Sequence, residues 1–133
     1  MTRELKTILL VEDDPDIATL ATMALRDLGG FEVTHAASGP EALDQLRRER
    51  PDMLILDYSM PGMNGGELLT AIKQMPELED IPAVFMTASV MPAHVAALRA
   101  LGAIDVFAKP FDPIALPDMI RGAWQASLDA ERS

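Results

Sequence analysis

The chain has 133 residues, no cysteine and a formal net charge of −10, and 49% of its residues are hydrophobic. This composition allows one domain with a substantial buried core, and it excludes disulfides, thiol nucleophiles and cysteine-bound metals. The acidic balance disfavours nucleic acid and anionic membranes as partners; with neither a bilayer-spanning apolar run nor a signal peptide pattern, we expect a cytoplasmic protein.

Apolar runs typical of strands alternate with segments of helical period along the whole chain. Glycine, proline and capping residues separate these segments and mark where helices begin and end. In chain order, the first half predicts a strand over residues 6–11, a helix over 16–28, a strand over 31–36, a helix opened by Ser38 and ended by Pro51, and a strand over 53–56. The second half predicts a helix opened by Asn64 and closed by Pro76, a strand over 82–86, a helix over 92–101, a strand over 104–108 and a last helix capped by Asp112.

Two of these helices carry more specific expectations. The helical spacing over residues 16–28 places Leu20 and Leu28 on the buried face of the first helix. In the last helix, Pro117 is expected to remove one backbone hydrogen bond and to kink the helix near its start.

Five strands and five helices in strict alternation predict an α/β fold. Right-handed crossovers then give a doubly wound, five-stranded parallel sheet with helices on both faces. Strand order 2-1-3-4-5, the flavodoxin-like arrangement, is the common choice at this size. We expect a single domain over residues 1–133, with its core at about 6–128 and no output domain.

Polar residues follow the central strands where each apolar run ends. They are Glu12, Asp13 and Asp14 after the first strand, Asp57 after the third, Thr87 after the fourth and Lys109 after the fifth. Ligands of open α/β sheets bind beyond the carboxyl ends of the strands, so these groups are expected to converge on one crevice.

Several carboxylates gathered in one crevice cannot all stay ionised without compensation. Oxygen ligands suit Mg²⁺, with Mn²⁺ as an alternative, and the lack of cysteine and histidine in the cluster argues against zinc. A divalent cation together with Lys109 can hold a phosphoryl group. Asp57 is then the natural nucleophile, which yields an aspartyl phosphate, and Thr87 can donate its hydroxyl to a phosphoryl oxygen.

Four segments of the chain resemble a known family, the receiver domain of two-component response regulators. The resemblance covers about residues 6–128, and the four segments occur in the family's order and spacing. They are Ile8-Leu-Leu-Val-Glu-Asp-Asp14, Leu54-Ile-Leu-Asp57 with Met60-Pro-Gly-Met-Asn-Gly65, Phe85-Met-Thr87-Ala88, and Lys109-Pro110-Phe111.

The resemblance implies a role for each matching residue. Asp14 is expected to bind Mg²⁺ directly and Asp13 mostly through water. Asp57 is both ligand and phosphoacceptor, and the backbone carbonyl of Ser59 completes the ligands. Lys109 is expected to pair with the phosphoryl group, and the bond from Lys109 to Pro110 is expected to be cis.

The family also implies partners. A histidine kinase or a histidine phosphotransfer protein is expected to supply the phosphoryl group, and a downstream protein is expected to respond to it. We expect a single-domain regulator that is a monomer or a weak dimer, with slow self-phosphotransfer and autodephosphorylation as its only chemistry.

One residue departs from the family pattern. Receiver domains usually place Tyr or Phe three residues before the lysine, where the ring moves inward as the threonine moves; this chain has Val106 there. A phosphorylation-independent scaffold with the receiver fold therefore remains an alternative.

Two other functions fit the residues less well. A Mg²⁺-dependent phosphatase with an aspartyl intermediate normally needs an acid two residues after the nucleophile, where this chain has Ser59. A flavodoxin-like cofactor binder would need a phosphate-binding loop in place of the acidic residues 12–14. His35 and His94 have no acidic or hydroxyl partners in motif spacing, and we expect both at the surface or at a sheet edge.

Overall fold

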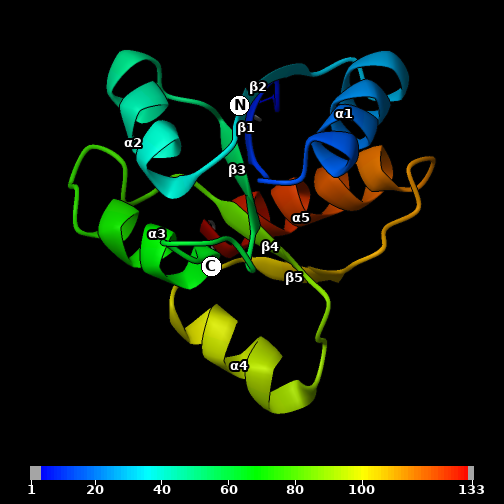
Figure 1. Cartoon of the computed structure of the whole chain (residues 1–133). Helices are drawn as coiled ribbons and strands as arrows, with labels where there is room; N and C mark the ends of the chain where they lie inside the picture. The colour runs from blue at the N-terminus through cyan, green and yellow to red at the C-terminus, as the bar shows by residue number, and fades with distance from the viewer. Residues whose placement is uncertain (1–3, 132–133) are drawn as a thin grey trace.

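Five parallel strands form one sheet in the order β2-β1-β3-β4-β5 (Figure 1). This is a computed structural model, and it describes residues 4–131. The predicted α/β fold and strand order are both confirmed. The strands are β1 (Thr7–Val11), β2 (Glu32–Ala36), β3 (Met53–Asp57), β4 (Ala83–Thr87) and β5 (Asp105–Ala108).

Helices cover both faces of the sheet. Figure 1 shows α1 and α5 on one side of the strands and α2 and α3 on the other, with α4 below β5. Leu98 of α4 belongs to the cluster under α2 and α3, so α4 packs on that face. Both groups pack on the sheet through apolar stripes, which makes three layers. The helices are α1 (Pro15–Met23), followed by the short π-helix η1 (Ala24–Leu28), α2 (Gly39–Arg48), α3 (Gly65–Lys73), α4 (Pro92–Ala100) and α5 (Leu116–Glu131).

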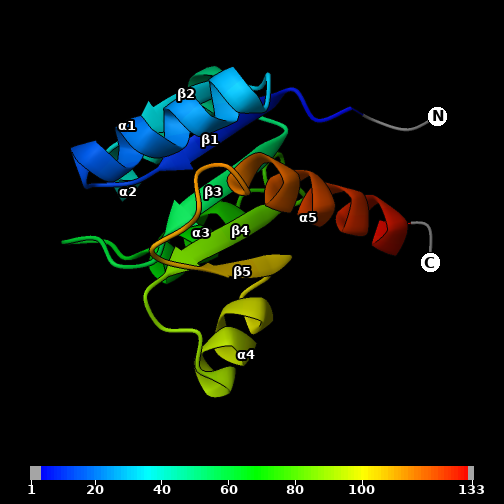
Figure 2. The same cartoon turned by 90° about the vertical axis from the view of Figure 1, so that its right-hand side faces the viewer.

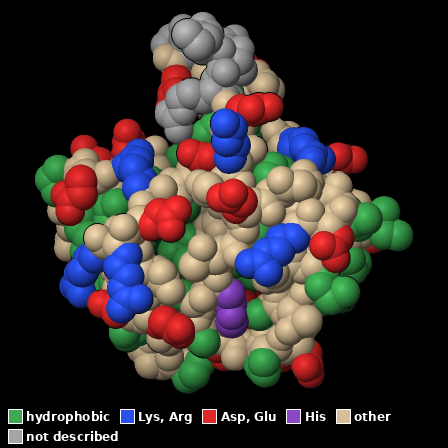
Figure 3. Space-filling view, turned by 90° about the horizontal axis from the view of Figure 1, so that it is seen from above, with side chains coloured by type: hydrophobic (Ala, Val, Ile, Leu, Met, Phe, Trp, Pro, Cys, Tyr) green, Lys and Arg blue, Asp and Glu red, His purple; other side chains and the backbone are tan. Residues whose placement is uncertain are grey.

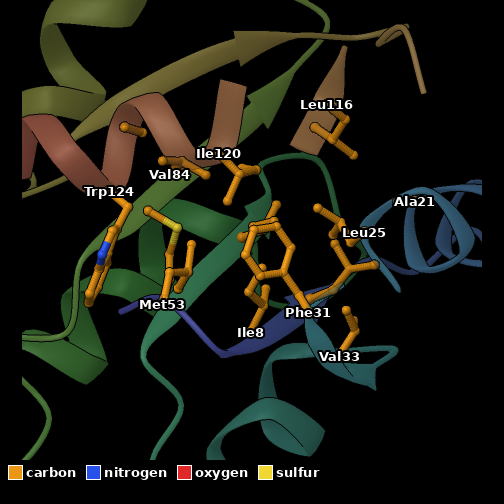
Figure 4. Close-up of a cluster of buried hydrophobic side chains, with 14 of the residues drawn as sticks. Ile8, Ala21, Leu25, Phe31, Val33, Met53, Val84, Leu116, Ile120 and Trp124 are labelled. Atoms are coloured by element: carbon orange, nitrogen blue, oxygen red, sulfur yellow. The ribbon is translucent and has the colours of Figure 1, made fainter. Parts of the chain in front are cut away.

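Side chains of the central strands alternate between two apolar clusters, one on each face. Ile8 and Leu10 of β1 point into the cluster under α1 and α5, whereas Leu9 and Val11 point into the cluster under α2 and α3. Figure 4 shows the first cluster, where Trp124 and Ile120 of α5 pack over the sheet, with Phe31 and Leu25 at the α1 side. Because both faces are covered, β3 and β4 are apolar throughout until each ends in a polar residue.

The first helix differs from its prediction because its last turn is a π turn. The N–H of Gly29 donates to the carbonyl of Ala24, five residues back, so the chain gains one residue in that turn. The added residue changes the helical period and directs Leu25 into the core. Leu28, predicted to be buried, is 59% exposed, and Leu20 is 46% exposed.

The predicted effect of Pro117 is also wrong. Helix α5 begins at Leu116, so Pro117 lies in its first turn, where a backbone N–H has no partner within the helix. The preceding residues form a separate turn in which Asp112 accepts the N–H of Ile114 on its side chain and the N–H of Leu116 on its carbonyl. Pro117 therefore costs the helix no hydrogen bond.

The surface around β2, α1 and α2 mixes charges of both signs. Acidic and basic side chains alternate on this face in Figure 3, and the described residues form no broad basic area there. Among residues 4–131, no helix is long and apolar enough to cross a bilayer.

Candidate functional site

Four strands deliver polar side chains to one end of the sheet. Because β1, β3, β4 and β5 run parallel, their carboxyl ends share an edge, at the left in Figure 2. Glu12 and Asp13 follow β1, Asp57 ends β3, Thr87 ends β4 and Lys109 follows β5. The polar residues that were predicted to follow the strands thus lie along the same end of the sheet.

Three carboxylates and one ammonium form the centre of this edge. Carboxylate oxygens of Glu12, Asp13 and Asp57 lie within 4.8 Å of one another. The Lys109 ammonium donates to Glu12 Oε1 at 3.0 Å and to Asp57 Oδ1 at 3.1 Å. Glu12 and Asp57 are buried, and Asp13 is the most exposed of the three acids. One ammonium faces three carboxylates, so the excess negative charge suits a divalent cation with oxygen ligands.

Burial and neighbouring charges change the proton affinities of this cluster. Desolvation is the main cause that raises the pKa of Asp57 to about 7; Glu12 raises that pKa further, and Lys109 acts against both. Burial alone would lower the pKa of Lys109, but its hydrogen bonds to Glu12 and Asp57 outweigh burial and raise the pKa above its usual value. Lys109 therefore stays charged, whereas Asp57 readily takes a proton near neutral pH.

Asp14 does not belong to this cluster, and its expected role as the direct metal ligand needs correction. Its side chain caps α1: Oδ1 accepts the N–H of Asp16 at 2.9 Å and the N–H of Ile17 at 3.3 Å. An acid at this position satisfies orphan amides and complements the helix dipole. The acids after β1 that reach the cluster are Glu12 and Asp13.

The loop after β3 lies close against the end of the strand because of Gly65. A Cβ at residue 65 would come within 2.5 Å of the Asp57 carbonyl, and the Gly65 N–H donates to the Tyr58 carbonyl at 2.8 Å. Asn64, which was predicted to open this helix, forms a capping box with Glu67 at the start of α3. Ser59 is exposed on this loop, two residues after Asp57, and its carbonyl stays a proposed ligand.

Thr87 is buried at the end of β4, and its hydroxyl has a partner that the sequence did not predict. Oγ1 accepts the N–H of Ser89 at 3.3 Å and lies 3.3 Å from Nε2 of His94. His94 is half-buried at the surface, and Thr87 is a hydroxyl partner that its sequence spacing did not predict. His35 is exposed on the edge strand β2 as predicted, and its Nε2 lies 2.7 Å from the Glu12 carbonyl.

The peptide bond between Lys109 and Pro110 is cis, as expected. It follows β5 directly, where the chain turns away and Lys109 points back to the acids. Val106 is half-buried against the cluster under α2 and α3 and brings no ring to Thr87.

A family model of the response regulator receiver domain matches residues 8–121. The chain belongs to this family. The chemotaxis protein CheY4 of Vibrio cholerae superposes with a TM-score of 0.84 at 30% identity, covering 90% of this chain and 99% of that one. Sporulation initiation phosphotransferase F of Bacillus subtilis is 36% identical over 86% of this chain and 90% of its own length.

The receiver domain also occurs within longer relatives. Response regulator Rre1 of Synechocystis is 33% identical over 93% of this chain, but the match covers only 55% of Rre1. The chain thus spans about half the length of such relatives. Receiver domains are the regulatory parts of two-component systems; they bind Mg²⁺ at an acidic pocket and interact with histidine kinases and phosphotransfer proteins.

Two features of the site were missed in the sequence for different reasons. Three consecutive acids follow β1, and only the backbone shows which of them turn inward and which caps the helix. The contact of His94 with Thr87 depends on the path of the loop between β4 and α4, for which the sequence carries no motif. The spacing of seven residues between them was the only available signal.

Proposed function

We propose that this receiver domain accepts a phosphoryl group on Asp57 from a histidine kinase or a histidine phosphotransfer protein and switches protein–protein interactions through it. The contact that supports this most directly joins the buried Asp57 carboxylate to the Lys109 ammonium at the end of the central strand. A carboxylate fixed beside a permanent positive charge can act as a nucleophile toward a phosphoryl group.

The donor set around Asp57 fits Mg²⁺, with Mn²⁺ as an alternative. Three clustered carboxylates with a single ammonium leave uncompensated negative charge. Burial is the main cause of the raised pKa of Asp57, and the nearby Glu12 raises that pKa further. We assign Asp13, Asp57 and the backbone carbonyl of Ser59 as ligands, while Glu12 holds Lys109. When bound, the cation neutralises charge on the phosphoryl oxygens.

The transfer exchanges one bond to phosphorus for another. A carboxylate oxygen of Asp57 attacks the phosphorus of the phosphohistidine, the phosphorus–nitrogen bond breaks, and the imidazole leaves with that electron pair. The product is an acyl phosphate on Asp57. Hydrolysis follows when water attacks phosphorus and the phosphorus–oxygen bond to Asp57 breaks, which returns the carboxylate and releases inorganic phosphate.

Lys109 and Thr87 act on the phosphoryl oxygens. Lys109 keeps its proton because its pKa is raised, so its charge is available to the added oxygens throughout the transfer. Thr87 follows Met86, the β4 residue that is in register with Asp57 across the sheet. Its hydroxyl has one proton, which it can donate to a phosphoryl oxygen on Asp57.

Incubation with acetyl phosphate and Mg²⁺ tests the assignment, with intact-mass spectrometry as the measurement. We expect one added phosphoryl group, which hydroxylamine removes and a chelator prevents. Asp57→Ala should abolish the label. Asp44→Ala, which removes an exposed carboxylate of α2, is the matched control and should label like the original protein. A label that persists in Asp57→Ala would refute the assignment.

A phosphorylation-independent scaffold is the second candidate, and Val106 is the observation that favours it. The usual aromatic residue at this position is missing, so an acyl phosphate would need another way to change the surface. A protein that takes no label under the conditions above, yet still binds a partner kinase or target, would support the scaffold.

A further inference from the structure

His94 of α4 contacts two parts of the phosphorylation site at once. Its Nε2 lies 3.3 Å from the hydroxyl oxygen of Thr87. Its ring packs edge-on against Tyr58, the residue that follows Asp57, with ring centroids 4.8 Å apart and an interplanar angle of 85°. Among the described residues, His94 is the side chain that hydrogen-bonds the Thr87 hydroxyl.

The rest of α4 is weakly attached at the same end. Leu98 is the one fully buried residue among residues 92–100, all of which the structure describes. The side chain of Met91 at the N-cap makes no capping hydrogen bond to the first amides of the helix. At the other end, Arg99 pairs with Asp105 at 3.0 Å and also reaches the carbonyl of Ile104. His94 therefore makes the polar contact that attaches the first half of α4 to the sheet.

The hydrogen bond to His94 competes with a bond to a phosphoryl group. The Thr87 hydroxyl already accepts the N–H of Ser89, and its single proton can go to only one acceptor. We assign that proton to Nε2 of a neutral His94 in the resting protein. If Thr87 instead donates to a phosphoryl oxygen on Asp57, His94 loses its partner.

We propose that His94 is the positioning residue through which a phosphoryl group on Asp57 changes helix α4, in the place of an aromatic residue at position 106. This rests on the proposed phosphorylation of Asp57. Loss of the Thr87 bond leaves α4 attached through Leu98 and Arg99, and it frees the imidazole beside Tyr58. That ring borders a groove of about 430 Å³ between α3 and α4, also lined by Glu67 and Leu101, so release of the ring changes one wall of this groove.

Imidazole ¹⁵N spectra give a direct readout, because the chain has only two histidines. They are recorded at about pH 8, where imidazoles are ordinarily neutral. In the resting protein we expect Nε2 of His94 as a hydrogen-bond acceptor. Phosphorylation by acetyl phosphate and Mg²⁺ should move its resonance to the position already seen in unphosphorylated Thr87→Val, which keeps the side-chain shape but has no hydroxyl. A protonated Nε2 at rest, or an unmoved resonance at full label, would overturn the proposal.

Amide hydrogen exchange of residues 93–100 tests the consequence for α4. Loss of one hydrogen bond should speed this exchange by about threefold to tenfold in the phosphorylated protein. His94→Phe keeps a ring against Tyr58 but cannot bond Thr87, so its exchange should be the same with and without label. Val106→Ala is the control and should respond like the original protein. All samples are compared at equal labelled fractions, measured by mass.

Two results separate the failure of this proposal from failure of the proposed function. If His94→Phe takes the label and its α4 still responds as in the original protein, His94 is not the link, although Asp57 phosphorylation stands. If the original protein takes no label, the proposed function fails and the link to α4 fails with it. If Val106→Ala lost the change in α4 exchange and His94→Phe kept it, Val106 of β5 and not His94 would link Asp57 to α4.

Discussion

Helices α4 and α5 lie on opposite faces of the sheet and are attached to it in different ways. Helix α5 has a continuous buried stripe, and helix α4 has one buried side chain, Leu98. Because α4 buries so little apolar surface, polar contacts help to attach it, through His94 in its first half and Arg99 near its other end. The buried residues of α5 are Leu116, Pro117, Ile120, Ala123, Trp124 and Leu128.

This difference shows which helix can respond to the site. Apolar burial has no direction and does not depend on what occupies Asp57, so we expect α5 to keep its place when Asp57 is phosphorylated. A hydrogen bond to the Thr87 hydroxyl depends on whether that hydroxyl has a better acceptor. Weakly packed elements with few apolar contacts are those that open at low free energy. Helix α4 therefore has the attachment suited to a switch.

Removing one core side chain from α5 is the strongest test of this contrast. Ile120→Ala deletes a fully buried side chain and should lower the free energy of unfolding by about 3 kcal/mol. Val95→Ala truncates a half-buried residue of α4 and should cost less than about 1 kcal/mol. Urea unfolding followed by circular dichroism measures both. Equal losses would show that α4 is as firmly packed as α5.

The free energy of unfolding should depend on pH because of Asp57, the acid at the end of β3. Its pKa is raised to about 7 in the folded protein, so the folded state holds a proton that the unfolded chain releases from about pH 4. Without Mg²⁺, this group therefore contributes a loss of stability as the pH rises from about 4 to about 7.

Asp57→Asn removes that contribution. The variant should be more stable than the original protein at about pH 8, by on the order of 2 kcal/mol, and nearly equal to it at about pH 4. Lys109 keeps its charge between these two pH values, so it does not make the stability depend on pH. Denaturant titrations with a chelator present give the difference at each pH. A variant that is less stable at the higher pH would contradict the cause given for the raised pKa.

The sheet was predictable because burial on both faces leaves a simple signal in sequence. Strands such as Met53–Asp57 are apolar at every position until their last residue, so both the strand and its polar end can be identified. Parallel pairing then brings Asp57, Thr87 and Lys109 to one edge without further information.

Contacts that depend on the path of a turn were not predictable. Asp13 and Asp14 are chemically identical neighbours, and one backbone turn decides which caps α1 and which reaches the acids. The π turn at Ala24–Leu28 shifts the helical period by one residue, which no local propensity encodes. The contact of His94 with Thr87 follows in the same way from the loop between β4 and α4.

The helix α1 is attached at its start by a cap, which gives the smallest expected effect. Asp14→Ala removes the acceptor of two amides and should cost about 1 kcal/mol of stability in urea. Because its carboxylate is turned to the helix, Mg²⁺ binding measured by calorimetry should change little. Asp13→Ala removes an acid of the cluster and should weaken Mg²⁺ binding by at least about tenfold. If Asp14→Ala weakened Mg²⁺ binding as much as Asp13→Ala, the carboxylate of Asp14 would have to leave the helix to bind the cation, and the assignment of Asp13 as the ligand would fail.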